Sequence, residues 1–205
     1  MYRPITILSS NSKTGCSLNL PIKGHCRPTK NCAKSCYAKC GHTALPSNLK
    51  KQNWVSEYLK GQDLSGLIQE CRGRTAVRLS GTGDILIEHV PNILRLSSSC
   101  PNTMFWGMTR KLEIAEALNG HLPNLKIMVS VDSSSPEAVQ NYKGTLCWGP
   151  RLATDQVPDL KKIRTIFPYH RSGKVIKEIP EDRRDCPAVR HQVSGCLECE
   201  RCWNW

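Results

Sequence analysis

Cysteine is the residue type whose number and spacing point most directly to chemistry in this sequence. The chain has 12 cysteines, of which five lie between Cys16 and Cys40 and four between Cys186 and Cys202. A disulfide framework would spread them more evenly, and residues 1–8 lack the features of a secretory signal. We therefore expect a cytoplasmic, reducing location, where clustered cysteines serve as metal ligands more often than as disulfides.

The C-terminal cysteines have the spacing C-x9-C-x2-C-x2-C, formed by Cys186, Cys196, Cys199 and Cys202. Two consecutive C-x2-C steps let one short loop direct three thiolates at one centre, and the distant Cys186 can supply a fourth. Bacterial ferredoxins use the same run to bind iron–sulfur clusters, whereas zinc sites more often pair two separated C-x2-C turns. The spacing favours a 4Fe-4S cluster, with zinc and inert cysteines as the alternatives.

The N-terminal cysteines Cys26, Cys32 and Cys36 have the spacing C-x5-C-x3-C. Three close thiolates can hold three irons of a second 4Fe-4S cluster, and the fourth iron could take Cys16, Cys40 or a non-protein ligand. An open position would make the cluster catalytic, and a fourth cysteine would make it structural or electron-transferring. The alternative is a solvated basic loop with incidental cysteines.

The elements that must position these cysteines follow a repeated pattern. Helical patterns alternate with strand-like segments along the chain. The strand-like segments are residues 5–8, 76–79, 104–108, 126–131, 145–148 and 164–167. Such alternation indicates βα units and a parallel sheet. Because six strands are fewer than the eight of a full barrel, we predict an α/β fold, either a partial (β/α)6-like barrel or an open parallel sheet.

We expect one domain over residues 1–205. It would comprise a cysteine-rich N-terminal loop (9–46), a βα core (76–170) and a C-terminal cluster-binding extension (174–205). The remaining cysteines, Cys71, Cys100 and Cys147, are predicted to be ordinary core residues, as are Trp106 and Trp148. The histidines His25, His42, His89, His121 and His191 are predicted to be surface or capping residues.

Polar side chains at the ends of the predicted strands form the candidate site, because function gathers at the carboxyl ends of parallel strands. The candidates are Ser80, Asp84, Thr109, Arg110, Lys111, Ser130, Asp132, His170 and Arg171. We predict that Asp84, Arg110 and Asp132 are catalytic, since Arg110 with Asp132 could bind a zwitterionic or phosphorylated ligand. Alternatively, Asp84 stabilises a glycine turn and Asp132 caps the helix that begins at Pro136.

Several motifs resemble those of a family of uncharacterised cysteine-rich bacteriophage proteins. The similarity covers nearly the whole chain and is carried by residues 11–15 (NSKTG), 26–38 (CRPTKNCAKSCYA), 78–85 (RLSGTGDI), 105–111 (FWGMTRK), 130–133 (SVDS) and 196–203 (CLECERCW). In that family the matching N-terminal cysteines are Cys26, Cys32 and Cys36, so Cys16 and Cys40 fall outside the pattern. A phage protein would act in the host cell cytoplasm.

The order of parts is also similar to that of radical S-adenosylmethionine enzymes. These enzymes have a three-cysteine loop after the first strand of a partial barrel, and often an auxiliary cluster near the C-terminus. Their glycine-rich turn after the second strand contacts the cofactor, which implies that Ser80, Gly81 and Gly83 bind S-adenosylmethionine here. The spacing departs from theirs, which is usually C-x3-C-x2-C.

The charge of the chain suggests an acidic partner. With 29 basic and 17 acidic side chains, the formal net charge is +12, which favours nucleic acid or an acidic host protein. Because thiolate-bound clusters are anionic, part of this excess would balance them. No apolar run is long enough to cross a bilayer, and we expect a monomer or small oligomer.

Two functions remain open from the sequence. The first is an iron–sulfur protein with radical S-adenosylmethionine-like catalysis or a redox role. The second is a non-enzymatic protein, stapled by iron–sulfur clusters or zinc, that binds nucleic acid or a host protein.

Overall fold

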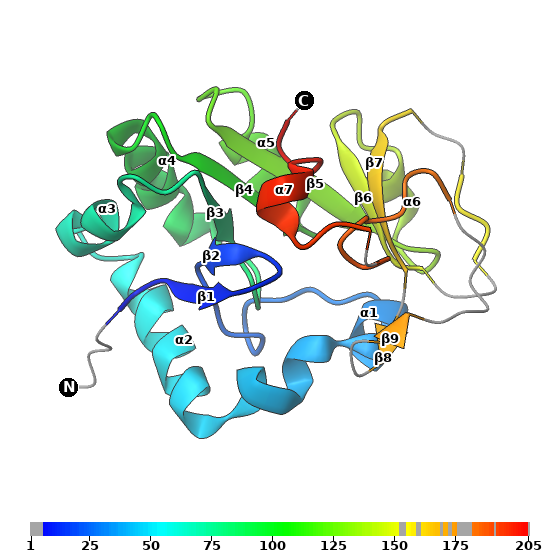
Figure 1. Cartoon of the computed structure of the whole chain (residues 1–205), viewed down its shortest axis with the longest axis horizontal. Coiled ribbons are helices and arrows are strands. Elements are labelled where there is room, and N and C mark those ends of the chain that lie inside the picture. Colours follow the sequence, from blue (N-terminus) through cyan, green and yellow to red (C-terminus); the bar gives the residue numbers. More distant parts are fainter. Residues whose placement is uncertain are drawn as a thin grey trace.

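The centre of the protein is one mixed sheet, seen here in a computed structural model (Figure 1). The structure describes residues 6–151, 155–158, 161–168, 170–171, 174–175, 182–190 and 192–204. The seven strands follow chain order across the sheet: β1 (Ser9–Asn11), β2 (Gly15–Ser17), β3 (Ala76–Leu79), β4 (Met104–Thr109), β5 (Leu125–Val131), β6 (Leu146–Arg151) and β7 (Ile163–Pro168). Strands β2 to β7 are parallel, and β1 is antiparallel to β2.

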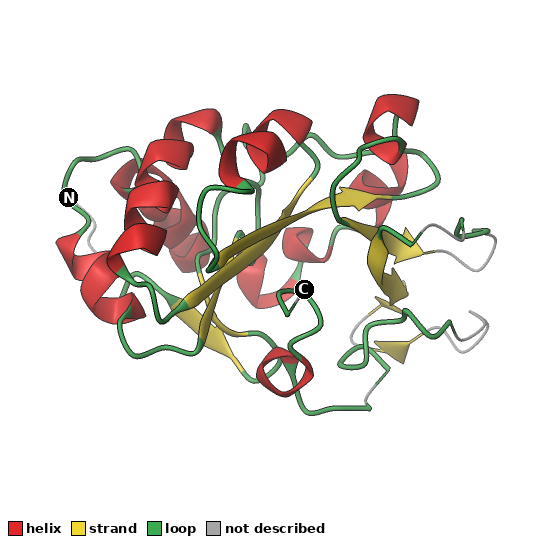
Figure 2. Cartoon of the chain, turned by 90° about the horizontal axis from the view of Figure 1, so that it is seen from above, coloured by secondary structure: helices red, strands yellow, loops and turns green. Residues whose placement is uncertain are grey.

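Most of the helices lie in the connections between the parallel strands, and the last one follows the final strand of the sheet. The α-helices are α1 (Lys30–Ser35), α2 (Pro46–Tyr58), α3 (Ser65–Cys71), α4 (Val90–Ser99), α5 (Leu112–Leu118), α6 (Glu137–Gln140) and α7 (Cys196–Cys199); the 3-10 helices are η1 (Tyr37–Lys39), η2 (Gly41–Ala44) and η3 (Ile87–His89). When parallel strands follow chain order, right-handed crossovers place their helices on one face. Figure 2 shows most helices along one side of the open, twisted sheet. The short strands β8 (His170–Arg171) and β9 (Lys174–Val175) form a separate antiparallel pair.

Alternating side chains along the strands build two different cores. Residues such as Val77, Phe105 and Val129 face the helices in the larger core, while Trp106, Met128 and Cys147 point to the opposite, inner face. On the inner face they pack against Cys202 and Trp203 of the C-terminal segment, whose helix α7 crosses the sheet in Figure 1. Burial on both faces explains why these strands read as nearly continuous apolar runs.

The predicted fold class is confirmed, because six parallel strands form an open sheet. Strand prediction was wrong at the N-terminus, where Thr6, Ile7 and Leu8 lie before β1; Ile5 lies outside the described residues. The Ile7 and Leu8 amides donate instead to the Glu70 carboxylate, at 2.7 and 2.9 Å.

The first two strands instead form a hairpin within the segment expected as a loop. Asn11 Oδ1 accepts the amides of Lys13 and Thr14 in its turn, at 3.0 and 2.7 Å.

In the described ranges, no helix is both long and apolar enough to span a membrane. The buried side chains of Cys71, Cys100 and Cys147 agree with their predicted place in the core.

Candidate functional site

Both cysteine sets lie on the wall of one cavity of about 520 Å³. Its lining includes all seven cysteines predicted as metal ligands: Cys26, Cys32, Cys36, Cys186, Cys196, Cys199 and Cys202. The rest of the wall comes from the inner face of the sheet and from the carboxyl ends of β3 to β7, including Arg78, Asp84, Trp106 and Thr165. Two sets separated by 150 residues of sequence therefore share one cavity.

The N-terminal cysteine loop is fixed to the ends of two strands. Thr29 caps α1, because its Oγ1 accepts the Cys32 amide (3.2 Å) and donates to Asp132 Oδ2 after β5 (2.5 Å). Farther along, the Tyr37 hydroxyl donates to the Gly81 carbonyl after β3 (2.5 Å). These bonds hold Cys32 and Cys36 against the carboxyl edge of the sheet.

The three N-terminal thiols share an electrostatic neighbourhood with Asp84. Burial raises the pKa of Cys26 to about 12, and the charges of Asp84, Cys32 and Cys36 add to the effect. Cys16 and Cys40 lie elsewhere: Cys16 packs against the helix-side core, and the exposed Cys40 donates its thiol to the Tyr37 carbonyl (3.2 Å). Neither lines the cavity.

The C-terminal set is held by contacts with the β1–β2 hairpin and β7. The Cys196 amide donates to the Lys13 carbonyl (2.6 Å), and the Cys186 amide donates to the Ile166 carbonyl (2.7 Å). A β-carbon at Gly195 would lie 2.7 Å from the Lys13 carbonyl oxygen, so glycine is required where α7 begins. The C-terminal extension is therefore anchored at both ends of its cysteine set.

The four C-terminal thiols are also close neighbours. Burial raises the pKa of Cys196 to about 11, opposed by the charge of Arg78 and helped by Cys186 and Cys199. Burial also raises the pKa of Cys202 well above its ordinary range, again with help from Cys186 and Cys196. Metal binding to either set would have to displace these protons.

The thiols surround the cavity without converging on one point. In the part of the chain that is described, no three histidine, cysteine or carboxylate side chains come together as ligands of one metal ion.

Arg110 and Asp132 form a buried pair behind this wall. The Arg110 guanidinium lies 3.1 Å from Asp132 Oδ2 and donates to the carbonyls of Ser130 (3.3 Å) and Gly149 (2.7 Å). Asp132 is fully buried and also accepts the Ser134 amide (2.8 Å). Arg110 lines the cavity and Asp132 does not, so Asp132 acts on the site through Arg110 and Thr29.

Asp84 stabilises the turn after β3 and also lines the cavity. Its carboxylate accepts the amides of Ile85 (2.8 Å) and Arg110 (3.3 Å), which stabilises the turn after β3. It also lines the cavity, and burial raises its pKa.

Among the other strand-end candidates, Thr109 and Ser130 line the cavity. The buried Lys111 donates to the Ile85 carbonyl (2.7 Å), and the side chains of His170 and Arg171 lie outside the described structure.

The glycine turn lies against the protein's own backbone. Gly83 has φ +70°, and a β-carbon there would lie 2.3 Å from the Leu20 carbonyl oxygen; one at Gly81 would lie 2.3 Å from Asn19 Oδ1. Ser80, at φ +54°, donates to the Met108 carbonyl (3.2 Å). Ser80, Gly81 and Gly83 still line the cavity, although the close approach that requires glycine is made by residues 19–21.

One histidine differs from the prediction of a surface or capping residue, and a second agrees with it. His25 is buried rather than exposed, and its Nδ1 lies 3.1 Å from the Asp84 carbonyl oxygen. Ser56 Oγ joins it to His89, at 3.2 Å from His25 Nε2 and 3.3 Å from His89 Nε2. His89 is buried too, although its Nδ1 accepts the Leu86 amide as a cap (3.3 Å). His25 thereby fixes the chain beside Cys26; His191 lies outside the described residues.

Sequence reasoning missed Arg78, which lies on the inner face between the sheet and the C-terminal cysteines. Its Cζ is 5.3 Å from the ring centroid of Trp106. Three buried polar atoms in this part of the wall have no hydrogen-bond partner: Arg78 Nε, Trp106 Nε1 and Thr165 Oγ1. Such orphans are rare in folded proteins, and these three lie among the residues that line the cavity. A lone arginine in the apolar strand Ala-Val-Arg-Leu was the available signal.

Comparisons with known proteins identify the family. No curated protein and no solved structure matches the chain. These comparisons therefore do not show the similarity to radical S-adenosylmethionine enzymes. Residues 5–205 match the family described as Gene product 88. The resemblance to a family of phage proteins is thus confirmed, and the chain belongs to the Gene product 88 family.

Proposed function

We propose that this protein is an iron–sulfur protein that binds two 4Fe-4S clusters on opposite walls of one cavity and transforms a small substrate between them. One observation carries the proposal: all seven cysteines with cluster spacing line the same cavity of about 520 Å³. Clusters that only stabilise the fold, or that act independently of each other, would not need to share a cavity.

The N-terminal cluster is the catalytic one in this proposal. Cys26, Cys32 and Cys36 would bind three irons, and the positions of Cys16 and Cys40 away from the cavity support an open fourth iron. Such a cluster supplies one-electron chemistry and a binding position for amino and carboxylate groups, which S-adenosylmethionine carries. Asp84, on the same wall, would accept hydrogen bonds from the ligand's ammonium group.

The C-terminal cluster is the auxiliary one. Arg78 and the Trp106 indole would donate hydrogen bonds to its sulfurs or to an anionic group of the substrate, and so satisfy their orphaned donors. The Trp106 and Trp203 rings, which pack at a tilt with their centroids 5.0 Å apart, would shield this cluster from water. This shielding would protect a reduced cluster from solvent.

Metal analysis after anaerobic purification tests the two sites separately. We expect about eight irons per chain, falling to about four in Cys32→Ser and in Cys199→Ser, because each 4Fe-4S cluster carries four irons. Cys40→Ser is the matched control, since this exposed thiol lies away from the cavity, and should retain all the iron. A colourless protein with stoichiometric zinc would refute the proposal.

Addition of S-adenosylmethionine to the reduced protein tests catalysis. We expect a change in the electron paramagnetic resonance signal in wild type and Cys199→Ser, and its loss in Cys32→Ser. If the protein holds eight irons but shows neither a spectral change nor cleavage of S-adenosylmethionine, the alternative of a non-enzymatic iron–sulfur binding protein is correct.

A further inference from the structure

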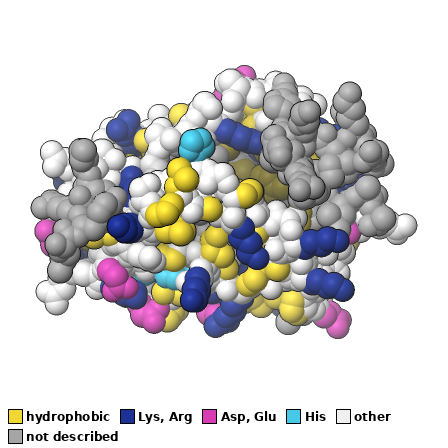
Figure 3. All heavy atoms as spheres, turned by 90° about the horizontal axis from the view of Figure 1, so that it is seen from below, with side chains coloured by type: hydrophobic (Ala, Val, Ile, Leu, Met, Phe, Trp, Pro, Cys, Tyr) yellow, Lys and Arg dark blue, Asp and Glu magenta, His cyan; other side chains and the backbone are white. Residues whose placement is uncertain are grey.

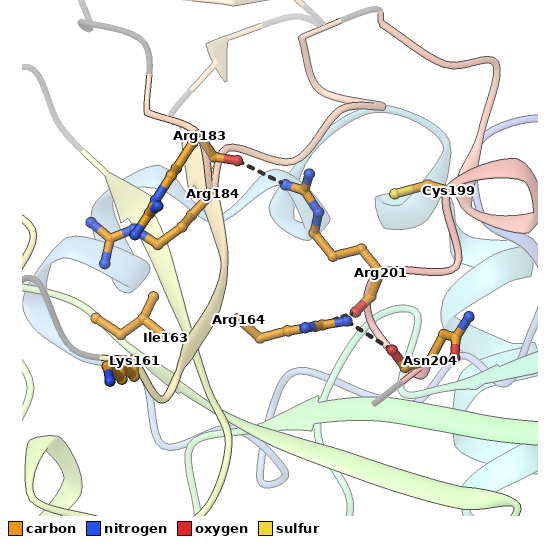
Figure 4. A pocket seen from close by; sticks show the side chains of 8 residues that line it. All are labelled: Lys161, Ile163, Arg164, Arg183, Arg184, Cys199, Arg201 and Asn204. Atoms are coloured by element: carbon orange, nitrogen blue, oxygen red, sulfur yellow. Dashed lines mark hydrogen bonds between the residues drawn. The ribbon is translucent and has the colours of Figure 1, made fainter.

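A second cavity, of about 600 Å³, lies on the outer side of the C-terminal segment (Figure 4). Its described lining contains five basic residues and no carboxylate: Lys161, Ile163, Arg164, Arg183, Arg184, Cys199, Arg201 and Asn204. Lysine and arginine side chains are scattered over other parts of the surface, as Figure 3 shows. What distinguishes this cavity, called here the basic groove, is that five of them line one space.

Most of this positive charge has no carboxylate partner within the part of the chain that the structure describes. Arg184 pairs with Asp182 at 2.8 Å, but Lys161, Arg164, Arg183 and Arg201 have no carboxylate partner among the described residues. An uncompensated group of four cations attracts an anion strongly, and a polyanion most of all.

Two of these arginines are held in place by neutral acceptors. Arg164 donates to the carbonyls of Arg201 (3.1 Å) and Asn204 (2.7 Å). Arg201 in turn donates to the carbonyls of Arg183 (3.5 Å) and Asp185 (2.7 Å). Carbonyl oxygens orient a guanidinium without cancelling its charge, so the groove is preorganised for an anionic ligand.

An irregularity in the sheet places Arg164 at the groove. Leu146 pairs with Ile163 and the next residue, Cys147, pairs with Thr165, so Arg164 is an extra residue on β7. Bulges at sheet edges redirect side chains. Ile163 and Thr165 are buried while Arg164 is exposed, so the extra residue directs a charge outwards from a buried strand.

We propose that the basic groove binds the phosphate backbone of nucleic acid. Three of the four unneutralised cations are arginines, whose planar fork matches phosphate geometry. Fixed arginines also suit a regularly spaced polyanion better than the mobile carboxylates of an acidic protein. Cys199 and Arg201 line both cavities, so the bound strand would lie against the C-terminal cysteine set.

Fluorescence anisotropy with a labelled single-stranded DNA and its duplex tests this proposal in the full-length protein across a salt series. Arg183→Gln with Lys161→Gln removes two exposed cations. We expect the slope of log K against log salt to fall by about 1.5, because each phosphate contact contributes about 0.7 to 0.9. Lys50→Gln, on the exposed surface of α2, is the matched control and should leave the slope unchanged.

Two results would overturn the proposal. Equal slopes in the double variant and wild type, with binding retained, would show diffuse attraction by the whole basic surface. Equally tight binding of labelled polyglutamate, with the same loss in the double variant, would assign the groove to an acidic protein. Unchanged iron content in all variants keeps this test independent of the cluster proposal.

Discussion

Replacement of Asp132 by asparagine separates a positioning role from a catalytic one. The carboxylate is fully buried, lies 3.1 Å from Arg110 and accepts hydrogen bonds from Thr29 and Ser134. Asparagine keeps its shape but leaves the Arg110 guanidinium, which is 12% exposed, without a counter-charge. Removing one partner of a buried ion pair costs about 3–5 kcal/mol. Because Arg110 keeps two carbonyl acceptors, we expect a loss of about 3 kcal/mol.

The same substitution should act on the N-terminal cysteines. Thr29 loses its charged acceptor while it caps the helix that contains Cys32, so Asp132→Asn should lose about four irons and retain the C-terminal four. Urea unfolding followed by circular dichroism, with iron analysis, measures both effects. Glu116→Gln, the same loss of charge on the exposed surface of α5, is the control and should change stability by less than about 0.5 kcal/mol. Wild-type stability and iron content with lost activity would refute the positioning role and support direct catalysis.

Three further predictions follow from single residues. Arg78→Gln should make the reduction potential of the C-terminal cluster more negative by roughly tens of millivolts, because a positive charge beside anionic sulfurs favours reduction; Arg95→Gln, on α4, is the spectroelectrochemical control. Burial, and then the charge of His25, lower the pKa of His89 from 6.5 to about 4. As the pH falls, His89 is therefore protonated in the unfolded chain before it is protonated in the folded protein. The free energy of unfolding should fall by up to about 3 kcal/mol as the pH drops from 6.5 to 4, and urea unfolding of His89→Gln should show a flatter pH profile. Gly83→Ala should cost well over 2 kcal/mol in thermal unfolding, because its β-carbon would meet the Leu20 carbonyl; Gly24→Ala has similar φ but open space and should cost about 1 kcal/mol.

Local patterns predicted the parts of this molecule that depend on short-range physics. The strands from β3 to β7 are apolar runs, those from β3 to β6 are separated by helices, and recognising them needs no knowledge of tertiary contacts. The cysteine spacings likewise grouped seven cysteines that line one cavity. The first strand was misplaced because the amides of Ile7 and Leu8 bind Glu70, 62 or more residues away.

The meeting of the two cysteine sets could not be predicted in this way. It depends on the Cys196 amide reaching the Lys13 carbonyl and on Trp203 packing against Trp106, contacts that link opposite ends of the chain. The burial of His25 has the same origin, because its partners Ser56 and Asp84 come from other elements. The hydrophobic periodicity of a segment does not predict contacts with residues that lie far away in the sequence.

The C-terminal segment contains little secondary structure of its own, and a bound cluster would stabilise it. Helix α7 has four residues, too few to be stable alone, yet its segment must cover the inner face at Trp106, Met128 and Cys147. Arg164 also depends on this segment for its acceptors at Arg201 and Asn204. A cluster bound by four cysteines would cross-link the segment to the core and release its binding energy as folding energy. The same cluster would then shape both the inner cavity and the basic groove, so cluster loss should weaken the two sites together.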